Sequence, residues 1–494
     1  MRGAGVTVLA QAIVFGLQMV GTIVLARLLT PADFGIVAMV TTFSLLLTNF
    51  GMNGFTEALI QRPEIDHGLV SDLFWINTAI GIALTLGFAA AGSLMARFYG
   101  DARIPGVAVG ISLSIFFTSI SVQHLALLKR AMRFSLVSAN DIVARLLSVF
   151  ISISLAWAGW GYWALVAGAV ALPLSTCIGS WILCRFTPSL PCGHTGTASV
   201  VRAALNIYGF FAVNYFSRNT DNLLVGWRFG SAALGFYKRA YDLFVLPANQ
   251  LLFPVSAVAL PTLSRLVDDR EKYRHYLLRS VAILAFVGMG LGALFTLIGR
   301  DLIFVLLGPK WGESGRIFTL FGPGIGAMFI SGTWSWVHLS IGRADRCFRW
   351  GIVEFVLTAA FFLVALPWGA MGIALAWTAS IWILSVPAFW YAGKPINIGA
   401  ASFIRSIWRY VLAAAMAGCG TAFIISSFSW LTFSPDTLGA ILRILGITVL
   451  FGSSYLVAVV VLHGGPEPLQ LVARLMPEFL PWKRFSQSSA KAAD

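Results

Sequence analysis

Charged residues are scarce in this chain of 494 residues, because Asp, Glu, Lys and Arg together make up only 11% of it. An ordinary soluble domain carries about a quarter charged residues. Hydrophobic residues reach 58%, and the mean hydropathy is +0.83. This composition excludes a typical soluble enzyme and indicates a membrane protein.

Cysteine is also rare, with five residues at positions 177, 184, 192, 347 and 419. No two of them have the short spacing of a zinc site, so we expect unpaired thiols, no structural disulfide and no metal. The sequence also lacks a Walker-type phosphate loop, a His-Glu-x-x-His motif and a Gly-x-Ser-x-Gly motif. We therefore expect a protein that is not an enzyme and has no cofactor, apart from a coupling proton or sodium ion that the sequence does not identify.

Long apolar stretches dominate the chain instead. A membrane-crossing helix needs about 20 mostly apolar residues. The pattern predicts fourteen such helices, at residues 6–26, 35–56, 73–96, 105–128, 142–160, 162–184, 203–226, 234–259, 281–307, 316–340, 350–367, 370–392, 407–428 and 438–462. Strand-like alternation is absent, which argues against a porin-like barrel. The expected fold class is an all-α polytopic membrane protein.

The net charge of +14 has a topological explanation. If the N-terminus is inside and the chain crosses fourteen times, most of the 34 Lys and Arg residues lie on the inner side. This bias fits the positive-inside rule with both termini cytoplasmic. We therefore expect no nucleic-acid partner.

Two segments that lie 200 residues apart resemble each other. Residues 29–35 (LTPADFG) and 229–235 (FGSAALG) each follow one apolar stretch and begin another. Arg2 matches Arg202 at the same offset, and Ala12 matches Ala212. Duplication of this kind is common in transporters.

The predicted spans divide evenly around a connector at residues 187–199 that is rich in Pro, Gly, Thr and Ser. Six spans precede it and six follow it up to residue 392, while the last two spans have no counterpart. An even number gives both halves the same orientation, so we expect parallel repeats related by an axis along the membrane normal. The predicted parts are an N-lobe at 1–190, a C-lobe at 200–392, two further helices at 393–464 and a cytoplasmic tail at 465–494.

Charged side chains within the apolar helices are the first candidates for a site, because inserting each costs about 2.5–3.5 kcal/mol. They gather around the second repeated segment, at Arg218, Asp221, Lys238, Arg239 and Asp242. Residues three or four apart share a helix face, so local ion pairs are one interpretation. The other is a cationic cavity that binds phosphate, since three positive charges oppose two negative ones.

Three further candidates lie in other predicted helices. Arg145 follows Asp141 by four residues, and the two form either a local ion pair or the entrance of a cavity. Trp334 belongs to an aromatic and polar stripe that either stacks on sugar rings or packs against helices and lipid. His338 is either the carrier of a coupling proton or a hydrogen-bonded core histidine.

Several motifs resemble the bacterial polysaccharide transporter family, and specifically its Wzx-type lipid-linked oligosaccharide flippases. They are residues 27–39 (RLLTPADFGIVAM), 53–61 (NGFTEALIQ), 221–226 (DNLLVG), 234–241 (LGFYKRAY) and 260–265 (LPTLSR). The family belongs to the multidrug/oligosaccharidyl-lipid/polysaccharide exporter superfamily. Length and pattern also resemble exporters of acidic exopolysaccharides of the succinoglycan type.

This resemblance implies two six-helix lobes that form a V around a central cavity, with two extra helices, in the bacterial inner membrane. The implied substrate is undecaprenyl diphosphate carrying one oligosaccharide repeat unit for exopolysaccharide or lipopolysaccharide synthesis. Surplus Arg and Lys in the cavity would attract the diphosphate, and rocking of the lobes would expose it to each side in turn. The implied protein partners are the polymerase and the chain-length regulator of the pathway. The alternatives are a cation-coupled drug exporter of the superfamily, and a membrane polymerase or scaffold.

Overall fold

The computed structural model describes residues 2–61, 66–191, 197–427 and 436–470. These residues are almost entirely helical and contain no strand. The expectation of an all-α fold is therefore confirmed. The contacts between Cα atoms divide the chain into two compact units, Met1–Lys238 and Arg239–Asp494.

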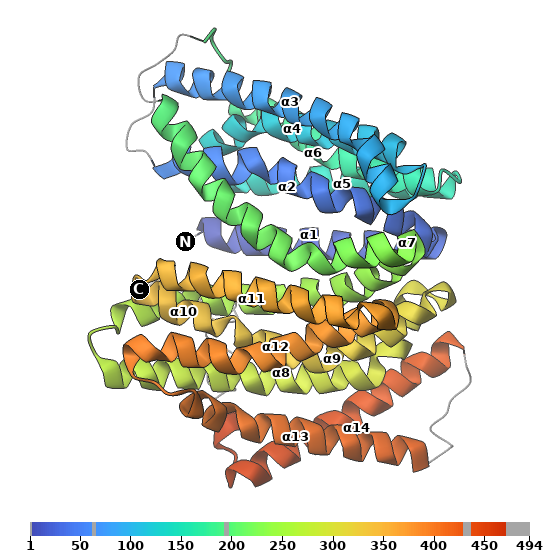
Figure 1. Ribbon diagram of the computed structural model, residues 1–494, viewed down its shortest axis with the longest axis vertical. Helices are drawn as coiled ribbons and strands as arrows, with labels where there is room; N and C mark the ends of the chain where they lie inside the picture. The colour runs from blue at the N-terminus through green and yellow to red at the C-terminus, as the bar shows by residue number, and fades with distance from the viewer. Residues whose placement is uncertain (1, 62–65, 192–196, 428–435, 471–494) are drawn as a thin grey trace, which may run out of the picture. The chain divides into compact units, whose positions relative to one another are not determined.

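The first unit contains six helices and the beginning of a seventh. They are α1 (Arg2–Leu28), α2 (Pro31–Gln61), α3 (His67–Tyr99), α4 (Ile104–Arg130), α5 (Phe134–Trp157), α6 (Tyr162–Cys184) and the first part of α7 (Thr197–Arg265). Helix α3 packs against α4, α5 packs against α6, and α4 also contacts α2 and α6 (Figure 1). Helix α4 is thus the central helix of this unit.

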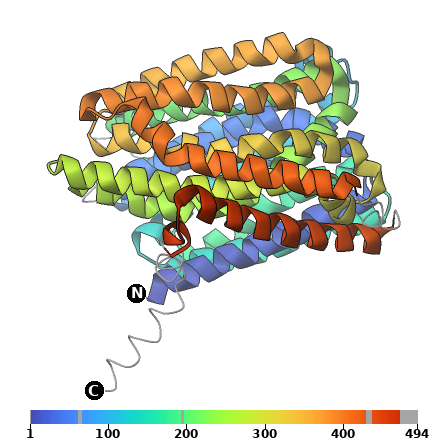
Figure 2. The ribbon, with the colours of Figure 1, turned by 90° about the horizontal axis from the view of Figure 1, so that it is seen from below.

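The second unit contains the rest of α7 and seven further helices. They are α8 (Arg270–Leu307), α9 (Gly312–Ser331), α10 (Thr333–Ser340), α11 (Ala344–Ala365), α12 (Gly369–Gly393), α13 (Ala400–Ser427) and α14 (Thr437–His463). Three short 3₁₀ turns, η1 (Pro309–Trp311), η2 (Leu366–Trp368) and η3 (Lys394–Ile396), join some of them. Helices α13 and α14 lie side by side and both contact α8 (Figure 2).

The packing of helices repeats between the two units, as the duplicated sequence predicts. The pairs α3–α4, α5–α6 and α4–α6 of the first unit correspond in chain order to α8–α9, α11–α12 and α9–α12 of the second, and all six pairs are in contact. Corresponding helices therefore have corresponding neighbours. These three corresponding contacts support a duplicated fold, while the parallel orientation of the repeats and the lobe boundaries at residues 190 and 200 stay predictions.

Eleven helices of the described residues are long and apolar enough to cross a membrane, or up to twelve if a bent pair in α7 counts as one span. This number is below fourteen partly because residues 344–396, which contain both α11 and α12, count once. In addition, α7 contains two of the predicted spans, joined at Gly230 with a non-helical φ of 80°. The chain is a multi-pass membrane protein, and the count of fourteen stays a prediction.

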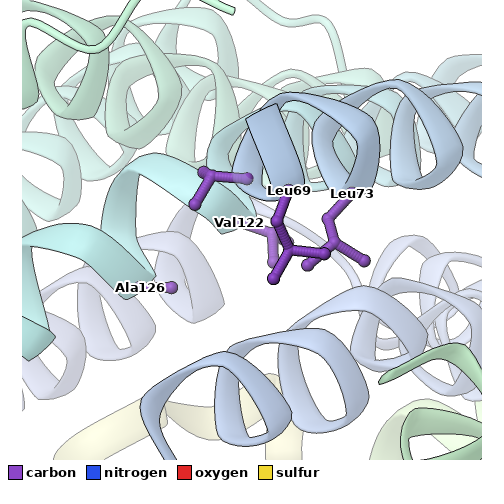
Figure 3. Packing of buried hydrophobic residues seen from close by; sticks show 5 residues of the cluster. Leu69, Leu73, Val122 and Ala126 are labelled. Carbon is purple, nitrogen blue, oxygen red and sulfur yellow. The ribbon is translucent and has the colours of Figure 1, made fainter. Parts of the chain in front are cut away.

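The contact of α3 with α4 illustrates how the first unit is held together. Leu69, Val70 and Leu73 of α3 meet Val122 and Ala126 of α4, and all five are buried (Figure 3). Spacings of three and four residues place these side chains on facing sides of the two helices. In lipid there is little hydrophobic gain from such a contact, so close van der Waals packing holds the pair.

Small residues hold α8 and α9 together in the second unit. A Cβ atom on Gly292 would lie 2.7 Å from the carbonyl oxygen of Gly322, and one on Gly288 would lie 2.6 Å from Cβ of Phe329. The Gly-x-x-x-Gly spacings at 288–292 and 322–326 therefore serve close helix approach. They are packing features of the scaffold.

Candidate functional site

Asp221 is the buried member of the charged cluster predicted around the second repeated segment, with 3% of its surface exposed. Its carboxylate accepts hydrogen bonds from the Tyr237 hydroxyl and from the backbone N–H of Asn222, both at 2.8 Å. In a straight helix, residues 221 and 237 would lie about 24 Å apart. They meet because α7 is interrupted at Gly230, whose positive φ suits glycine.

The sequence-based pairing of Asp221 with Arg218 is not what the structure forms. The Arg218 side chain is exposed, and within the described residues it has no ion pair. The tyrosine at position 237 was missed because the predicted spans at 203–226 and 234–259 indicate that the chain turns back between them but not which side chains then face each other. The signal that could have found it is the glycine at position 230, midway between the two partners.

The other three residues of the predicted cluster lie around the boundary between the units. Lys238 ends the first unit and is close enough to Asp221 to interact with it electrostatically. Arg239 begins the second unit, and its guanidinium lies 3.4 Å from the Asp242 carboxylate, three residues further on. The local ion pair expected for Arg239 and Asp242 is therefore present. The role of the cluster in phosphate binding stays a prediction.

Arg145 lines a cavity of about 420 Å³ inside the first unit, between α1, α2, α4, α5 and α6. Seven hydroxyl side chains and three charged ones contribute to its wall. They are Thr41, Ser44, Thr48, Ser114, Thr118, Ser121 and Thr176, together with Lys129, Asp141 and Arg145. This cavity, which has charged and hydroxyl side chains among apolar ones in its wall, is the main candidate site.

The hydroxyl groups in the wall of this cavity are available to a ligand as hydrogen-bond acceptors and not as donors. Each donates its proton to a backbone carbonyl of its own helix, as Thr118 does to Ser114 at 2.8 Å and Thr176 to Leu172 at 2.9 Å. The remaining lone pairs of the oxygen atoms can accept hydrogen bonds from a ligand. The wall therefore suits a ligand that is rich in hydroxyl groups.

Arg145 supplies an unused donor in the same cavity. Its Nε atom is buried and has no hydrogen-bond partner within the described residues. Asp141 and Arg145 interact electrostatically but form no direct ion pair in that part of the chain. Because a buried guanidinium N–H normally has an acceptor, an anionic oxygen or a water must satisfy it. With Lys129 the three charged groups have a net charge of +1.

The position of Arg145 along α5 also argues for a functional role. It lies eleven residues after Phe134, the first residue of the helix, which corresponds to about 16 Å along the axis. A charged side chain in an apolar helix that is long enough to cross a membrane is expensive to insert and normally faces a cavity or a partner. The sequence indicated Arg145 and Asp141, but it did not indicate the seven hydroxyls. The available signal was the spacing of three or four residues between the six of them that lie on α2 and α4.

Trp334 and His338 belong to an aromatic cluster of the second unit. His338 is fully buried, and its ring lies 5.9 Å from that of Trp334 and 5.4 Å from that of Tyr391. Trp350 stacks on Tyr391 at 5.9 Å, and the Arg346 guanidinium lies 4.0 Å above the same tyrosine. Neither ring nitrogen of His338 has a partner among the described residues. Sugar stacking on Trp334 and proton transfer by His338 both stay predictions.

Residues 24–316 match the model of the family described as "Polysaccharide biosynthesis protein", which is more than half of the chain. The succinoglycan biosynthesis transport protein of Rhizobium meliloti (strain 1021) is 24% identical over 437 residues, which cover 86% of this chain and 87% of that protein. The lipopolysaccharide biosynthesis protein WzxC of Escherichia coli (strain K12) is 23% identical over 431 residues, which cover 83% and 84%.

Two solved structures are similar in fold. The lipid II flippase MurJ in an inward closed conformation has a TM-score of 0.73 at 13% identity, covering 91% of this chain and 97% of that chain. A multidrug resistance transporter of the MATE family in an inward-facing conformation has a TM-score of 0.62 at 14% identity, covering 77% and 94%. At such low identity, the likeness establishes the fold alone.

Proposed function

This chain belongs to the polysaccharide biosynthesis protein family, and from that premise we propose that it flips undecaprenyl-diphosphate-linked oligosaccharide units across the bacterial inner membrane. The names of its relatives support transport in polysaccharide synthesis. The observation that carries the proposal is Arg145 with its unsatisfied Nε donor, deep in a hydroxyl-lined cavity.

The physical task explains why such a cavity is needed. A sugar-diphosphate headgroup loses its hydration in hydrocarbon, whereas the polyprenyl tail can remain in lipid. A protein that lowers the barrier must offer the headgroup replacement partners within the membrane. In this proposal, Arg145 and Lys129 bind anionic oxygens, and the hydroxyl oxygens accept hydrogen bonds from sugar hydroxyls.

The size of the cavity limits what it holds. A volume of about 420 Å³ falls at the lower end of small-molecule sites, which span roughly 300–1,000 Å³. It therefore takes one part of the headgroup at a time, such as the diphosphate with its first sugar. Arg218, Lys238 and Arg239 are proposed as a second set of phosphate contacts.

The topology and partners of the protein are part of the same proposal. Both termini face the cytoplasm, because the basic segments lie on that side under the positive-inside rule. The polymerase and the chain-length regulator of the pathway act on the unit after it has been flipped. The net positive charge of Lys129, Asp141 and Arg145 disfavours export of cationic drugs, which calls for acidic partners.

Reconstitution into liposomes tests this function directly. Vesicles carry a fluorescent oligosaccharide linked to undecaprenyl diphosphate, and a membrane-impermeant quencher reports how much headgroup is exposed outside over time. We expect the wild-type chain and the Arg97→Ala control to exchange the headgroup between leaflets. Arg145→Ala should reduce the rate at least about tenfold, because a charge-assisted contact is lost, while Arg145→Lys retains part of it.

Two outcomes would contradict the proposal. If folded Arg145→Ala protein translocates at the wild-type rate, the cavity is not the headgroup site. If the wild-type chain leaves the headgroup in its original leaflet, even with an imposed ion gradient, the protein acts as a scaffold of the synthesis complex.

A further inference from the structure

The beginning of α13 combines cations and exposed apolar side chains on one surface. Ile404, Trp408, Leu412 and Met416 recur every four residues, and 39–54% of each is exposed. A spacing of four keeps these side chains on one stripe of the helix. Arg405 and Arg409 each follow a member of the stripe by one residue, and both are exposed. The stripe therefore has positive charge at one end and is apolar along the rest.

Two tryptophans hold cations at this end of the second unit. The Lys394 ammonium lies 3.5 Å from the centre of the Trp390 ring, and the Arg409 guanidinium lies 5.7 Å from that of Trp408. Trp390 and Trp408 are 53% and 45% exposed. A cation that rests on a ring keeps its outward N–H groups for an anion. We call Trp390, Lys394, Arg405, Trp408 and Arg409 the basic-aromatic surface.

Acidic groups that could neutralise this surface are missing from its own segment. No Asp or Glu occurs between Glu354 and Asp436 in the sequence. Lys394, Arg405 and Arg409 form no ion pair within the described residues. The adjoining helices add positive charge, since Arg274 of α8 donates to the Ser402 hydroxyl at 3.3 Å. His463 of α14 packs on Tyr410 with ring centroids 4.7 Å apart.

We propose that the basic-aromatic surface binds the headgroup of an anionic phospholipid, with the acyl chains along the stripe from Ile404 to Met416. The first and last residues of the stripe are twelve positions apart, or about 18 Å along the helix, which is close to the roughly 15 Å of hydrocarbon in one leaflet. A soluble anion would contact only the basic-aromatic surface. A phospholipid would contact this surface with its headgroup and the apolar stripe with its acyl chains. Arg405 and Arg409 contact the phosphate, and the tryptophans lie at headgroup level, where such rings concentrate.

This lipid site is separate from the cavity of Arg145, because it lies on the outer surface of the second unit. It does not depend on the proposed flipping activity. Its test is therefore a binding measurement on the full-length purified protein, with no transport readout.

The probes are phosphatidylglycerol, cardiolipin and phosphatidylcholine, added to the detergent-solubilised chain and counted as bound adducts by native mass spectrometry. The variant K394Q/R405Q/R409Q removes three charges from the surface. The matched control R300Q/K310Q/R316Q removes three exposed charges from the end of α8, η1 and the beginning of α9. R405K/R409K keeps the charge, and size-exclusion profiles confirm that each variant is folded.

We expect the wild-type chain and the matched control to bind both anionic lipids at least about tenfold more tightly than phosphatidylcholine. K394Q/R405Q/R409Q should lose most of that preference, since each basic residue near the headgroups adds attraction, and R405K/R409K should keep it. Equal loss in both triple variants would overturn the proposal, because diffuse charge would then explain the binding. Unchanged binding by K394Q/R405Q/R409Q would also overturn it, as would preferential binding of undecaprenyl phosphate over both phospholipids at this surface.

Discussion

Gly35 and Gly235 pack backbone against backbone. Each lies in one copy of the repeated segment and contacts the backbone of the other copy. A Cβ atom on Gly35 would collide with the carbonyl oxygen of Ser231 and lie 3.0 Å from the Gly235 nitrogen. A Cβ atom on Gly235 would collide with the carbonyl oxygen of Pro31 and lie 3.2 Å from the Gly35 nitrogen. The contact is reciprocal, as at a two-fold interface. The two copies of the repeated segment are therefore similar in sequence and also in direct contact with each other.

Alanine at either glycine should destabilise the first unit. The added methyl group meets backbone that cannot move aside as a flexible side chain can, so we expect each of Gly35→Ala and Gly235→Ala to cost at least about 1–3 kcal/mol. Thermal unfolding in detergent measures this. Gly87→Ala is the matched control, since a Cβ there meets nothing within 4 Å and alanine favours helix.

The double variant adds a sharper test of the reciprocal contact. Because both glycines serve the same close approach, Gly35→Ala with Gly235→Ala should cost less than the sum of the two single changes. Two fully additive effects, or single variants as stable as Gly87→Ala, would show that the segments do not depend on this contact.

The sequence predicts the scaffold better than the site, because helices and repeats are visible as patterns in the sequence, whereas contacts between side chains depend on how the helices pack. Apolar length and the matching residues at 35 and 235 are enough to predict helices, their orientation and the duplication. The contact between those two glycines depends on how helices pack, which the matching letters do not specify. Asp221 shows the same limit, since its partner Tyr237 becomes adjacent only through the break at Gly230.

The cavity shows a second reason for incomplete prediction. Ser and Thr are common in membrane helices, where they bond to their own backbone, so Ser114 or Thr118 does not differ from many others in sequence. Only their convergence with Arg145 in the wall of one cavity distinguishes them from other hydroxyl residues. An intramembrane charge is rare, and this is why Arg145 was recognised and the hydroxyls were not.

Tyr237→Phe should destabilise the protein more than Arg218→Ala. The phenylalanine leaves the buried Asp221 carboxylate without its 2.8 Å donor, for which we expect a cost of about 1–3 kcal/mol. Arg218 is exposed and lacks an ion pair among the described residues, so its replacement should change stability by less than about 0.5 kcal/mol. Unfolding midpoints of the two variants in the same detergent show which change costs more stability. If Arg218→Ala costs more, Asp221 is paired with Arg218 and not with Tyr237.

The attachment of α14 to α8 is expected to depend on one ion pair. The Arg443 guanidinium donates to both oxygens of Asp301, at 2.8 and 3.2 Å, and both side chains are 22% exposed. A bidentate pair with this partial exposure should show a coupling energy of about 1 kcal/mol in a double-mutant cycle of Asp301→Asn and Arg443→Gln. A coupling energy near zero would mean that the other contacts hold α14, among them the hydrogen bond of 2.7 Å from the Tyr455 hydroxyl to the Phe286 carbonyl of α8.

Asp101 gives a small acid dependence of stability in the turn between α3 and α4, outside the membrane spans. Its hydrogen bond from the Arg103 side chain lowers the pKa of the Asp101 carboxyl below its usual value. A lowered pKa in the folded state stabilises the protein above the unfolded value of about 3.9, and this gain is lost as the pH falls through the folded value. Because Arg103 is exposed, the effect should be at most about 1 kcal/mol. Unfolding curves measured at a series of pH values from 6 downwards should show the stability difference between wild type and Asp101→Asn shrinking progressively once the pH falls below about 3.9.

The hydroxyl wall of the cavity can be tested without disturbing its charges. Thr118→Val keeps the shape of the side chain but removes a hydroxyl group from a residue that lines the cavity, so in the proposed function a sugar hydroxyl loses an acceptor. We expect the substrate concentration for half-maximal flipping to rise about fivefold, which corresponds to one neutral hydrogen bond of about 1 kcal/mol. Thr85→Val is the matched control, because Thr85 makes the same kind of bond to its own helix, to the Gly81 carbonyl at 2.7 Å, and does not line the cavity. Equal effects of the two variants would assign the change to helix stability. An effect of Thr118→Val alone, in protein that unfolds at the same temperature as wild type, would place a hydroxyl-bearing part of the headgroup against α4.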